Sequence, residues 1–191
     1  MSRMVMLVLM MAVAGVALAA SESYTIDPNH TYPNFTINHL GFSTMHGRFG
    51  KTSGKLTLDR DTMTGSVDVT IDASSVDTGF QKRNDHLRSP DFLNVGEFPT
   101  ITYKADNVKL NKDGTGMVNG KLTLAGVTKI VPLKVDRMNC ATHPFDPSKK
   151  KFVCGFDASA TIKRSDFGVN YGLPAISDEM QLSFELEAER D

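Results

Sequence analysis

Apolar and polar residues alternate with a period of two along much of this chain, and no other feature constrains its fold as strongly. Successive side chains of a strand point to opposite faces, so this pattern is typical of antiparallel strands that bury one face. Residues that favour turns separate the alternating runs, as in Asp27-Pro28-Asn29 and Asp146-Pro147. Short strands with such turns predict an all-β sandwich or barrel. The clearest runs are 34–39, 55–58, 67–71, 121–124 and 182–187.

One segment, residues 75–94, interrupts the alternation. Its centre predicts a short helix over 78–87, with Thr78 as the N-cap, and Ser89-Pro90 then opens another turn. A helical insertion therefore separates two groups of strands. Connections of this length are often functional.

The first 19 residues have the pattern of a secretory signal peptide. Arg3 precedes an apolar run that ends in Ala17-Leu18-Ala19. The run is short for a membrane span, which needs about 20 apolar residues, although an uncleaved anchor is the alternative. We expect cleavage after Ala19, export, and a single domain over residues 20–191.

The only two cysteines are Cys140 and Cys154. An exported protein meets an oxidising compartment, so one disulfide is the default expectation. It would close a loop of about 15 residues, which stabilises by roughly 3 kcal/mol in the chain-entropy model. A pair of free or redox-active thiols is the alternative, although their spacing is not C-x-x-C.

The net charge of −1 argues against a nucleic-acid partner, and the spacing of the histidines argues against a metal site. A near-neutral chain lacks the basic surface that nucleic acids require. The five histidines show no metal-ligand spacing, and no G-x-S-x-G motif occurs. We therefore predict no metal, no cofactor and no catalytic residues. The alternative is an enzyme in which His86, beside Asp85, acts as a general base.

Four segments, in order, resemble motifs of the YceI-like family. The first, HTYPNFTINHLGFSTMHGRF, contains a His-Leu-Gly-Phe-Ser run, and the second contains a helix motif ending in His-Leu-Arg-Ser. The branch with a cysteine pair before a Ser-Asp-Phe-Gly segment looks closest. Together the segments span nearly all of residues 20–191: they are 30–49, 73–105, 120–133 and 158–188.

The chain departs from the family pattern at two positions. Asn84 stands where the helix motif usually has aspartate, which would weaken a link to a neighbouring arginine or histidine. Pro33 stands early in the first long strand, where an aliphatic residue is usual. Because proline cannot donate to a ladder, we expect it at a strand start, an edge or a bulge.

The resemblance implies a lipocalin-like antiparallel β-barrel of about eight strands, with a short helical insertion and an apolar tunnel. Such proteins bind amphiphiles, for example polyisoprenoid diphosphates, ubiquinone or fatty-acid amides, and have no general enzymatic activity. They are mostly periplasmic and often dimeric. The expected partner is an amphiphilic lipid, and the resemblance also allows a homodimer and a transient membrane contact.

Candidate ligand-binding residues follow from the resemblance and from the strand phase. Phenylalanine and methionine provide apolar walls, and arginine or histidine provides donors for a diphosphate or a quinone carbonyl. The predicted tunnel lining is Phe35, Ile37, Phe42, Met45, Phe49, Leu87, Phe92, Phe98, Leu122, Leu124 and Phe167. The head-group candidates are His39, His46, Arg83, His86 and Arg88.

Three alternatives stay open at this point. In the first, the cluster of Arg83, His86 and Arg88 only braces the helix against the barrel. In the second, the barrel core is solid and the protein is a stress-related structural or interaction protein. The third is an enzyme that acts on amphiphilic substrates.

Overall fold

The computed structural model describes residues 21–191, and the predicted signal peptide lies outside this range. The described chain is almost entirely antiparallel sheet, with one α-helix, α1 (Gln81–Arg88). Its strands are β1 (Glu22–Ile26), β2 (Tyr32–His39), β3 (Ser43–Phe49), β4 (Thr52–Asp59), β5 (Thr64–Asp72), β6 (Val76–Asp77), β7 (Thr100–Lys109), β8 (Gly116–Leu124), β9 (Val127–Thr142), β10 (Phe152–Lys163) and β11 (Ile176–Arg190).

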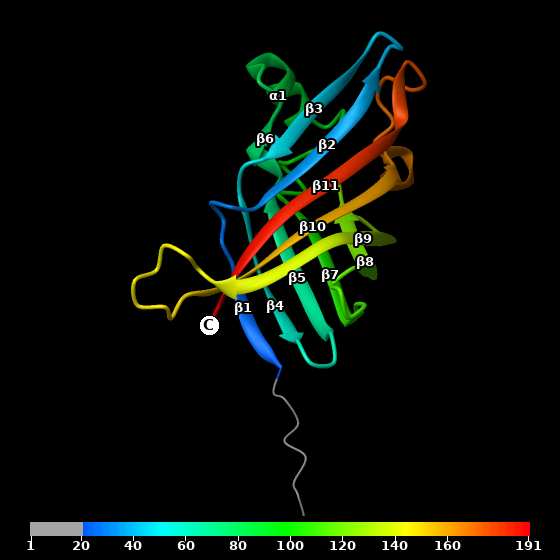
Figure 1. The fold of residues 1–191 in the computed structure, drawn as a ribbon. Coiled ribbons are helices and arrows are strands. Elements are labelled where there is room, and N and C mark those ends of the chain that lie inside the picture. The colour runs from blue at the N-terminus through cyan, green and yellow to red at the C-terminus, as the bar shows by residue number, and fades with distance from the viewer. Residues whose placement is uncertain (1–20) are drawn as a thin grey trace, which may run out of the picture.

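The sheet closes on itself because β1 pairs with both β4 and β11. The ring runs β1-β4-β5-β7-β8-β9-β10-β11 and returns to β1, which gives a closed barrel of eight strands. The predicted antiparallel barrel is thus confirmed (Figure 1).

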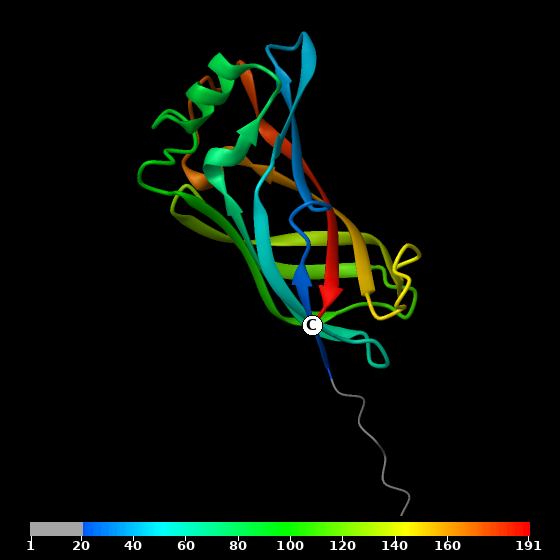
Figure 2. The same ribbon diagram turned by 90° about the vertical axis from the view of Figure 1, so that its left-hand side faces the viewer.

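Three strands of the ring, β1, β4 and β5, are each joined by a short irregular break to a strand that extends beyond the ring: β2, β3 and β6. Residues 27–31 separate β1 from β2, Gly50 and Lys51 separate β3 from β4, and η1 (Ala73–Ser75) separates β5 from β6. The breaks lie side by side: the amide of Gly50 donates to the Ser75 carbonyl, and that of Asp72 to the Lys51 carbonyl. The β2–β3 hairpin therefore extends beyond the ring at the end where α1 lies, which we call the mouth end (Figure 2).

Pro33 lies near the start of β2, opposite Phe184, as expected for a residue that cannot donate to the ladder. The helix begins later than predicted, at Gln81, and Phe80 rather than Thr78 is its N-cap. Gly79, with a φ of 73°, turns the chain between Thr78 and the helix. The interaction that Thr78 makes instead belongs to the site described below.

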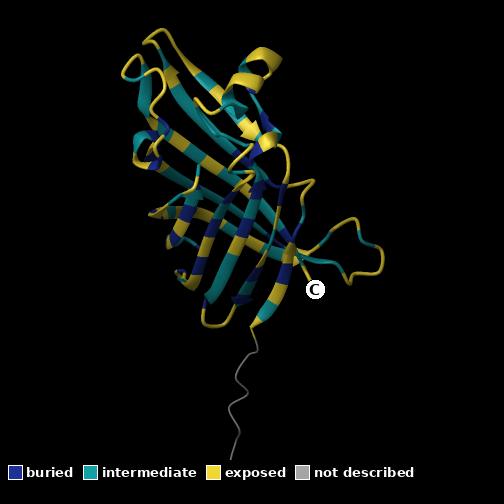
Figure 3. Cartoon of the chain, turned by 180° about the vertical axis from the view of Figure 1, so that it is seen from behind, coloured by how far each residue is buried: buried dark blue, intermediate teal, exposed yellow. Residues whose placement is uncertain are grey.

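The alternation seen in the sequence becomes inward and outward side chains. Along the strands, buried and exposed residues form alternating bands (Figure 3). Leu56 and Leu58 of β4 are buried, while Thr57 between them is half-buried and Lys55 before them is exposed. Inside the ring Tyr103 crosses Gly120, where a Cβ atom would lie 2.2 Å from its ring, so this position accepts no side chain.

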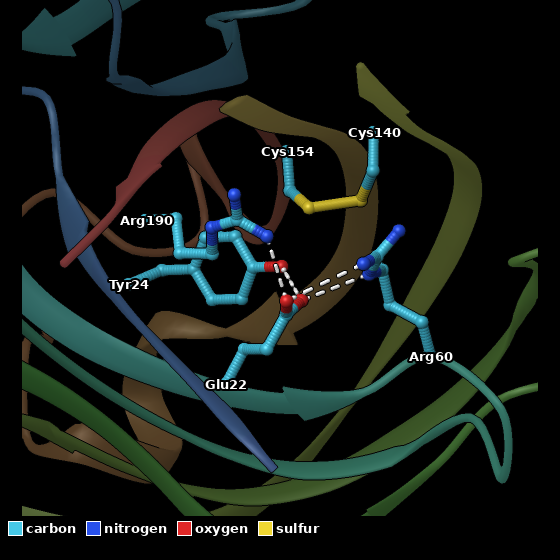
Figure 4. The surroundings of a disulfide bond; sticks show 6 residues. All are labelled: Glu22, Tyr24, Arg60, Cys140, Cys154 and Arg190. Atoms are coloured by element: carbon cyan, nitrogen blue, oxygen red, sulfur yellow. Dashed lines mark hydrogen bonds and ion pairs between the residues drawn. A yellow bond between two sulfur atoms is a disulfide. The ribbon is translucent and has the colours of Figure 1, made fainter. Parts of the chain in front are cut away.

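The disulfide between Cys140 and Cys154 confirms the expected pairing (Figure 4). It joins directly opposite residues of β9 and β10 at the end of the barrel away from α1, which we call the far end. The cross-link ties together the hairpin whose connection, residues 143–151, is the longest at this end.

A polar cluster holds the barrel seam beside the disulfide (Figure 4). The Glu22 carboxylate accepts hydrogen bonds from Tyr24 Oη (2.6 Å), Arg60 Nε (2.9 Å) and Arg190 Nη1 (2.7 Å). Both guanidinium groups lie 4.7 Å from the Phe152 ring centre. These bonds, that from Arg60 above all, lower the pKa of Glu22 to about 2. The cluster joins β1, the β4–β5 turn and β11, the elements that close the ring.

Substituting Glu22 is expected to weaken the barrel and to change its acid sensitivity. A carboxyl whose pKa falls from 4.5 to about 2 on folding stabilises the fold above pH 4.5, and this stabilisation is lost towards pH 2. Glu22→Gln should therefore lower the free energy of unfolding by about 1 to 2 kcal/mol at pH 7. Urea denaturation at several pH values should show a flatter acid limb between pH 4.5 and 2.

Glu97→Gln is the control, because Glu97 lies in the exposed connection before β7 and accepts a hydrogen bond from Asn94 alone among the described residues. An unchanged acid limb in Glu22→Gln would contradict the role given to this carboxylate.

Candidate functional site

An apolar cavity of about 270 Å³ lies inside the mouth end of the barrel. Its wall comes from β2 and β3 on one side, α1 and its connection on another, and barrel strands below. Aliphatic and aromatic side chains make up most of the lining: Pro33, Phe35, Ile37, Met45, Phe49, Ile71, Val76, Leu87, Phe92, Leu93, Ile101, Leu122, Leu124, Ile162, Val169, Tyr171, Ile176, Met180, Leu182 and Phe184.

A second apolar cavity, of about 130 Å³, lies deeper in the barrel. Pro33, Ile71, Leu122 and Phe184 line both cavities. These four residues form a partition, so the two cavities are chambers of one interior. The predicted alternative of a solid core does not fit this interior.

The structure brings eight of the eleven predicted lining residues to the upper chamber. Phe35 reaches inward because Gly47 of β3 leaves room for its ring: a Cβ at Gly47 would lie 2.2 Å from that ring. Gly47 therefore allows the Phe35 ring to lie against the backbone of β3. The eight residues are Phe35, Ile37, Met45, Phe49, Leu87, Phe92, Leu122 and Leu124.

The other three predicted lining residues lie outside the wall of this cavity. Phe42 is 87 % exposed, because the left-handed conformations of Leu40 and Gly41 form the β2–β3 turn and end the strand phase before it. Phe98 packs against Gly126 of the β8–β9 turn. Phe167 is buried in the core from the 3-10 helix η2 (Arg164–Phe167), where the period of two no longer applies.

Four of the five predicted head-group residues line the upper chamber, namely His39, His46, Arg83 and His86. Arg88 does not. Its guanidinium donates to the carbonyls of Ser74 (2.7 Å) and Val76 (3.1 Å), which anchors α1 to η1 and β6. The bracing alternative therefore describes Arg88, whereas Arg83 and His86 reach the cavity.

Arg83 faces the cavity with part of its guanidinium available. Nε and Nη2 donate to the hydroxyl and carbonyl oxygens of Thr78, both at 2.7 Å. Nη1 lies 3.7 Å from the sulfur of Met45, which is a weak acceptor. The cation is thus positioned by the chain before α1, while one edge retains donors for a stronger acceptor.

Asn84 holds the start of α1 in place, and its side chain hydrogen-bonds to Thr78 and Asp77 rather than to an arginine or a histidine. Its buried Oδ1 accepts from the amide (2.8 Å) and hydroxyl (2.6 Å) of Thr78, and its Nδ2 donates to Asp77 (3.1 Å). An aspartate here would set two carboxylates side by side, because Asp77 is already the acceptor. The departure from the family motif therefore leaves no broken link to an arginine or histidine in this chain.

His86 stands at the rim in a cluster of aromatic rings. Its Nε2 lies 2.8 Å from the Asp91 carboxylate, and its ring meets the rings of Phe92 and Tyr171 edge-on, with centroids 5.0 Å away in each case. Asp91, rather than the adjacent Asp85, is its partner. Ser89 Oγ donates to the backbone carbonyl of His86 (2.8 Å), and within residues 21–191 no serine hydroxyl is hydrogen-bonded to the His86 ring, so the geometry of an activated nucleophile is missing there.

Among the lining residues that the sequence did not predict, Arg164 and Tyr171 carry polar groups. Arg164 is only 2 % exposed, and its guanidinium donates to four carbonyls between Val169 and Ser177, at 2.8 to 3.0 Å. Burial lowers the pKa of this guanidinium from its usual value. No local pattern marks a buried arginine of this kind. By contrast, Met180, Leu182 and Phe184 of β11 could have been predicted, because they continue the alternation of apolar and polar residues.

Metal and membrane-spanning features are absent from the part of the chain that the structure describes. Residues 21–191 contain no group of three or more metal-ligating side chains, and no helix there is long and apolar enough to cross a membrane.

Comparisons with known proteins agree with this architecture. A UPF0312 protein of Pseudomonas paraeruginosa is 39 % identical over 178 residues, covering 93 % of this chain and 91 % of the relative. The crystal structure of Burkholderia cenocepacia BcnA superposes with a TM-score of 0.70 at 27 % identity, covering 85 % of this chain and 98 % of that one.

A more distant neighbour shares the fold. The Saccharophagus degradans protein, described as a polyisoprenoid binding domain implicated in plant cell wall breakdown, gives a TM-score of 0.66 at 19 % identity and covers 89 % of this chain and 99 % of that one. The model of the YceI-like domain matches residues 24–188, which is nearly the whole described chain. This chain therefore belongs to the YceI-like family.

Proposed function

We propose that this protein is a non-catalytic carrier for an isoprenoid lipid or quinone in the periplasm. The observation that carries the proposal is the two-chambered apolar interior with Arg83 and three histidines at its upper end. The description of the Saccharophagus degradans neighbour as a polyisoprenoid binding domain supports the same ligand class. The disulfide is in keeping with an oxidising compartment.

Apolar burial would supply most of the affinity for the tail. Each buried CH₂ contributes about 0.8 kcal/mol, less the cost of ordering a flexible chain. An apolar cavity of about 150 Å³ already holds benzene, so the upper chamber has room for the first part of a tail. A longer tail would enter the lower chamber once Leu122 and Phe184 of the partition adopt other rotamers.

The polar residues at the upper end would bind the head group. Arg83 suits a diphosphate, because a guanidinium can donate two parallel hydrogen bonds to one anion. A quinone carbonyl needs only a neutral donor, which His39, His46 or His86 could provide. The two head-group classes therefore depend on different side chains.

The direct test is to identify what the protein carries. Protein purified from its own compartment and analysed by native mass spectrometry should show a bound isoprenoid, and lipid extraction should recover it. Protein stripped of lipid should rebind that isoprenoid saturably. Purified protein without an apolar ligand and without saturable isoprenoid binding would refute the proposal.

Filling the upper chamber is expected to abolish binding while leaving the fold intact. Ile37 lines the chamber between Met45 and Met180 of the neighbouring strands. Ile37→Trp should lower isoprenoid affinity at least tenfold, because the indole occupies the volume of the tail. The cost to stability should be about 1–3 kcal/mol, as for other overpacked cores.

Ile130→Trp is the matched control, since Ile130 is 61 % exposed on β9. The chain has no tryptophan, so each variant has a single fluorophore that reports binding and unfolding. Equal affinities in the two variants would show that the chamber is not the binding site.

Removing the Arg83 cation should distinguish the head-group classes. Arg83→Gln is expected to weaken a prenyl diphosphate about tenfold or more, because a charge-assisted hydrogen bond is lost. Binding of a quinone with a similar tail should change little. Lys82→Gln is the control for net charge, because Lys82 is exposed on α1 and does not line the chamber. Titration calorimetry measures the affinity of each variant for the prenyl diphosphate. If Arg83→Gln and Lys82→Gln lose the same affinity, the effect comes from long-range charge and not from a contact with Arg83.

A further inference from the structure

The turns at the two ends of the barrel differ in charge. At the far end each turn carries charged residues: Arg60 and Asp61 before β5, Lys112 and Asp113 before β8, and Asp146 with three lysines before β10. At the mouth end, the β2–β3 and β8–β9 turns and the segment 167–177 contain no Asp, Glu, Lys or Arg. The charged residues of this end, among them Lys82, Asp85 and Asp91, lie on α1 and in the connection after it. On a chain that is 23 % charged, the uncharged turns beside them suit a partner that offers no charge at the contact.

The uncharged turns also expose large apolar side chains. Phe42 is 87 % exposed, Leu40 45 % and Tyr171 48 %. The amide of Leu40 donates to the carbonyl of Ala175 (3.0 Å), so the β2–β3 turn and the segment 167–177 form one surface. We call Leu40, Phe42 and Tyr171 the apolar rim.

The apolar rim is continuous with the cavity. Tyr171 belongs to both, and His39 and Met45 of the same hairpin line the upper chamber. A molecule that leaves an apolar phase across the rim would therefore reach the cavity beside Tyr171, next to the His86–Asp91 pair.

We propose that the mouth end docks onto a lipid bilayer, with Leu40, Phe42 and Tyr171 entering the interfacial region. This inference rests on the proposed function, because the bilayer would be the source and the destination of the carried lipid. Aromatic side chains with one polar tip, such as Tyr171, favour that interface, and apolar burial there gives reversible binding. Since the rim has no cation, the attraction should not require anionic lipid or low salt.

A bilayer suits this surface better than a second copy of the chain. A stable protein interface buries about 800 Å² on each partner, whereas the rim consists of two side chains at a hairpin tip and Tyr171 beside it. A dimer through this end would also cover the entrance to the cavity. A bilayer, in contrast, accepts a projecting tip of any shape.

Phenylalanine occurs at both ends of the barrel with equal exposure, which provides a matched pair of variants. Phe145 lies in the β9–β10 connection at the far end and, like Phe42, is 87 % exposed. Flotation with phosphatidylcholine vesicles, with and without phosphatidylglycerol, should show wild-type protein bound to both. Phe42→Asp should reduce the bound fraction at least fivefold, and Phe145→Asp should leave it unchanged.

Single-tryptophan variants report the contact directly, because the chain has no other tryptophan. The emission of Phe42→Trp should shift to shorter wavelength when vesicles are added, and that of Phe145→Trp should not. Wild-type protein that does not float, or equal effects at both positions, would overturn the proposal. A Phe42→Asp variant that loses self-association measured without vesicles would also overturn it, by assigning the rim to a second copy.

Binding of soluble farnesyl diphosphate separates this inference from the proposed function. Phe42→Asp should bind this probe like wild type, because Phe42 lies outside the cavity wall. Vesicle binding that depends on Phe42, in a protein without isoprenoid affinity, would leave the docking surface in place and refute the carrier.

Discussion

The pairing of β1 with both β4 and β11 is the interaction on which the rest of the structure depends. It converts a sheet with two open edges into a ring, and only a ring has an enclosed interior. β11 is long enough to serve twice: its last residues pair with β1, and its earlier residues pair with β2. Glu22 and Arg190 reinforce this seam at the far end, where the disulfide ties the neighbouring hairpin. The same strand, β11, therefore closes the ring and supports the hairpin that extends at the mouth end.

The cavity follows from the breaks in three adjacent strands. After those breaks β2, β3 and β6 diverge from the ring, and the space above the barrel core is covered by α1 and by the connection that Arg164 holds. Two close approaches, Phe35 over Gly47 and Tyr103 over Gly120, let large rings lie inside without filling the space. The same hairpin supplies one wall of the upper chamber and the exposed tip at Phe42. Ligand space and outer surface are thus parts of a single element.

Strand phase explains which site residues could be predicted. Phe35, Ile37 and His39 lie on regular strand, and their inward direction follows from the period of two. Phe42 and Phe167 lie where a turn and a 3-10 helix end that phase, so their composition suggested a lining that the backbone does not allow. For Arg83 and Arg88, five residues apart on α1, the sequence could not tell the cavity from the brace. The packing of α1 against η1 and β6, where Arg88 donates to the Ser74 and Val76 carbonyls, separates their roles.

The sequence by itself determined the all-β class, the family and the inward face of most strands, because alternation and ordered motifs are local properties of the chain. It also indicated the disulfide, since two cysteines in an exported chain have few other fates. Only the folded chain shows what depends on distant segments meeting: the partition at Pro33, Ile71, Leu122 and Phe184, the burial of Arg164, and the grouping of uncharged turns at the mouth end. These features arise where the ring closes and its turns gather at one end, and no local pattern encodes which turns will be neighbours.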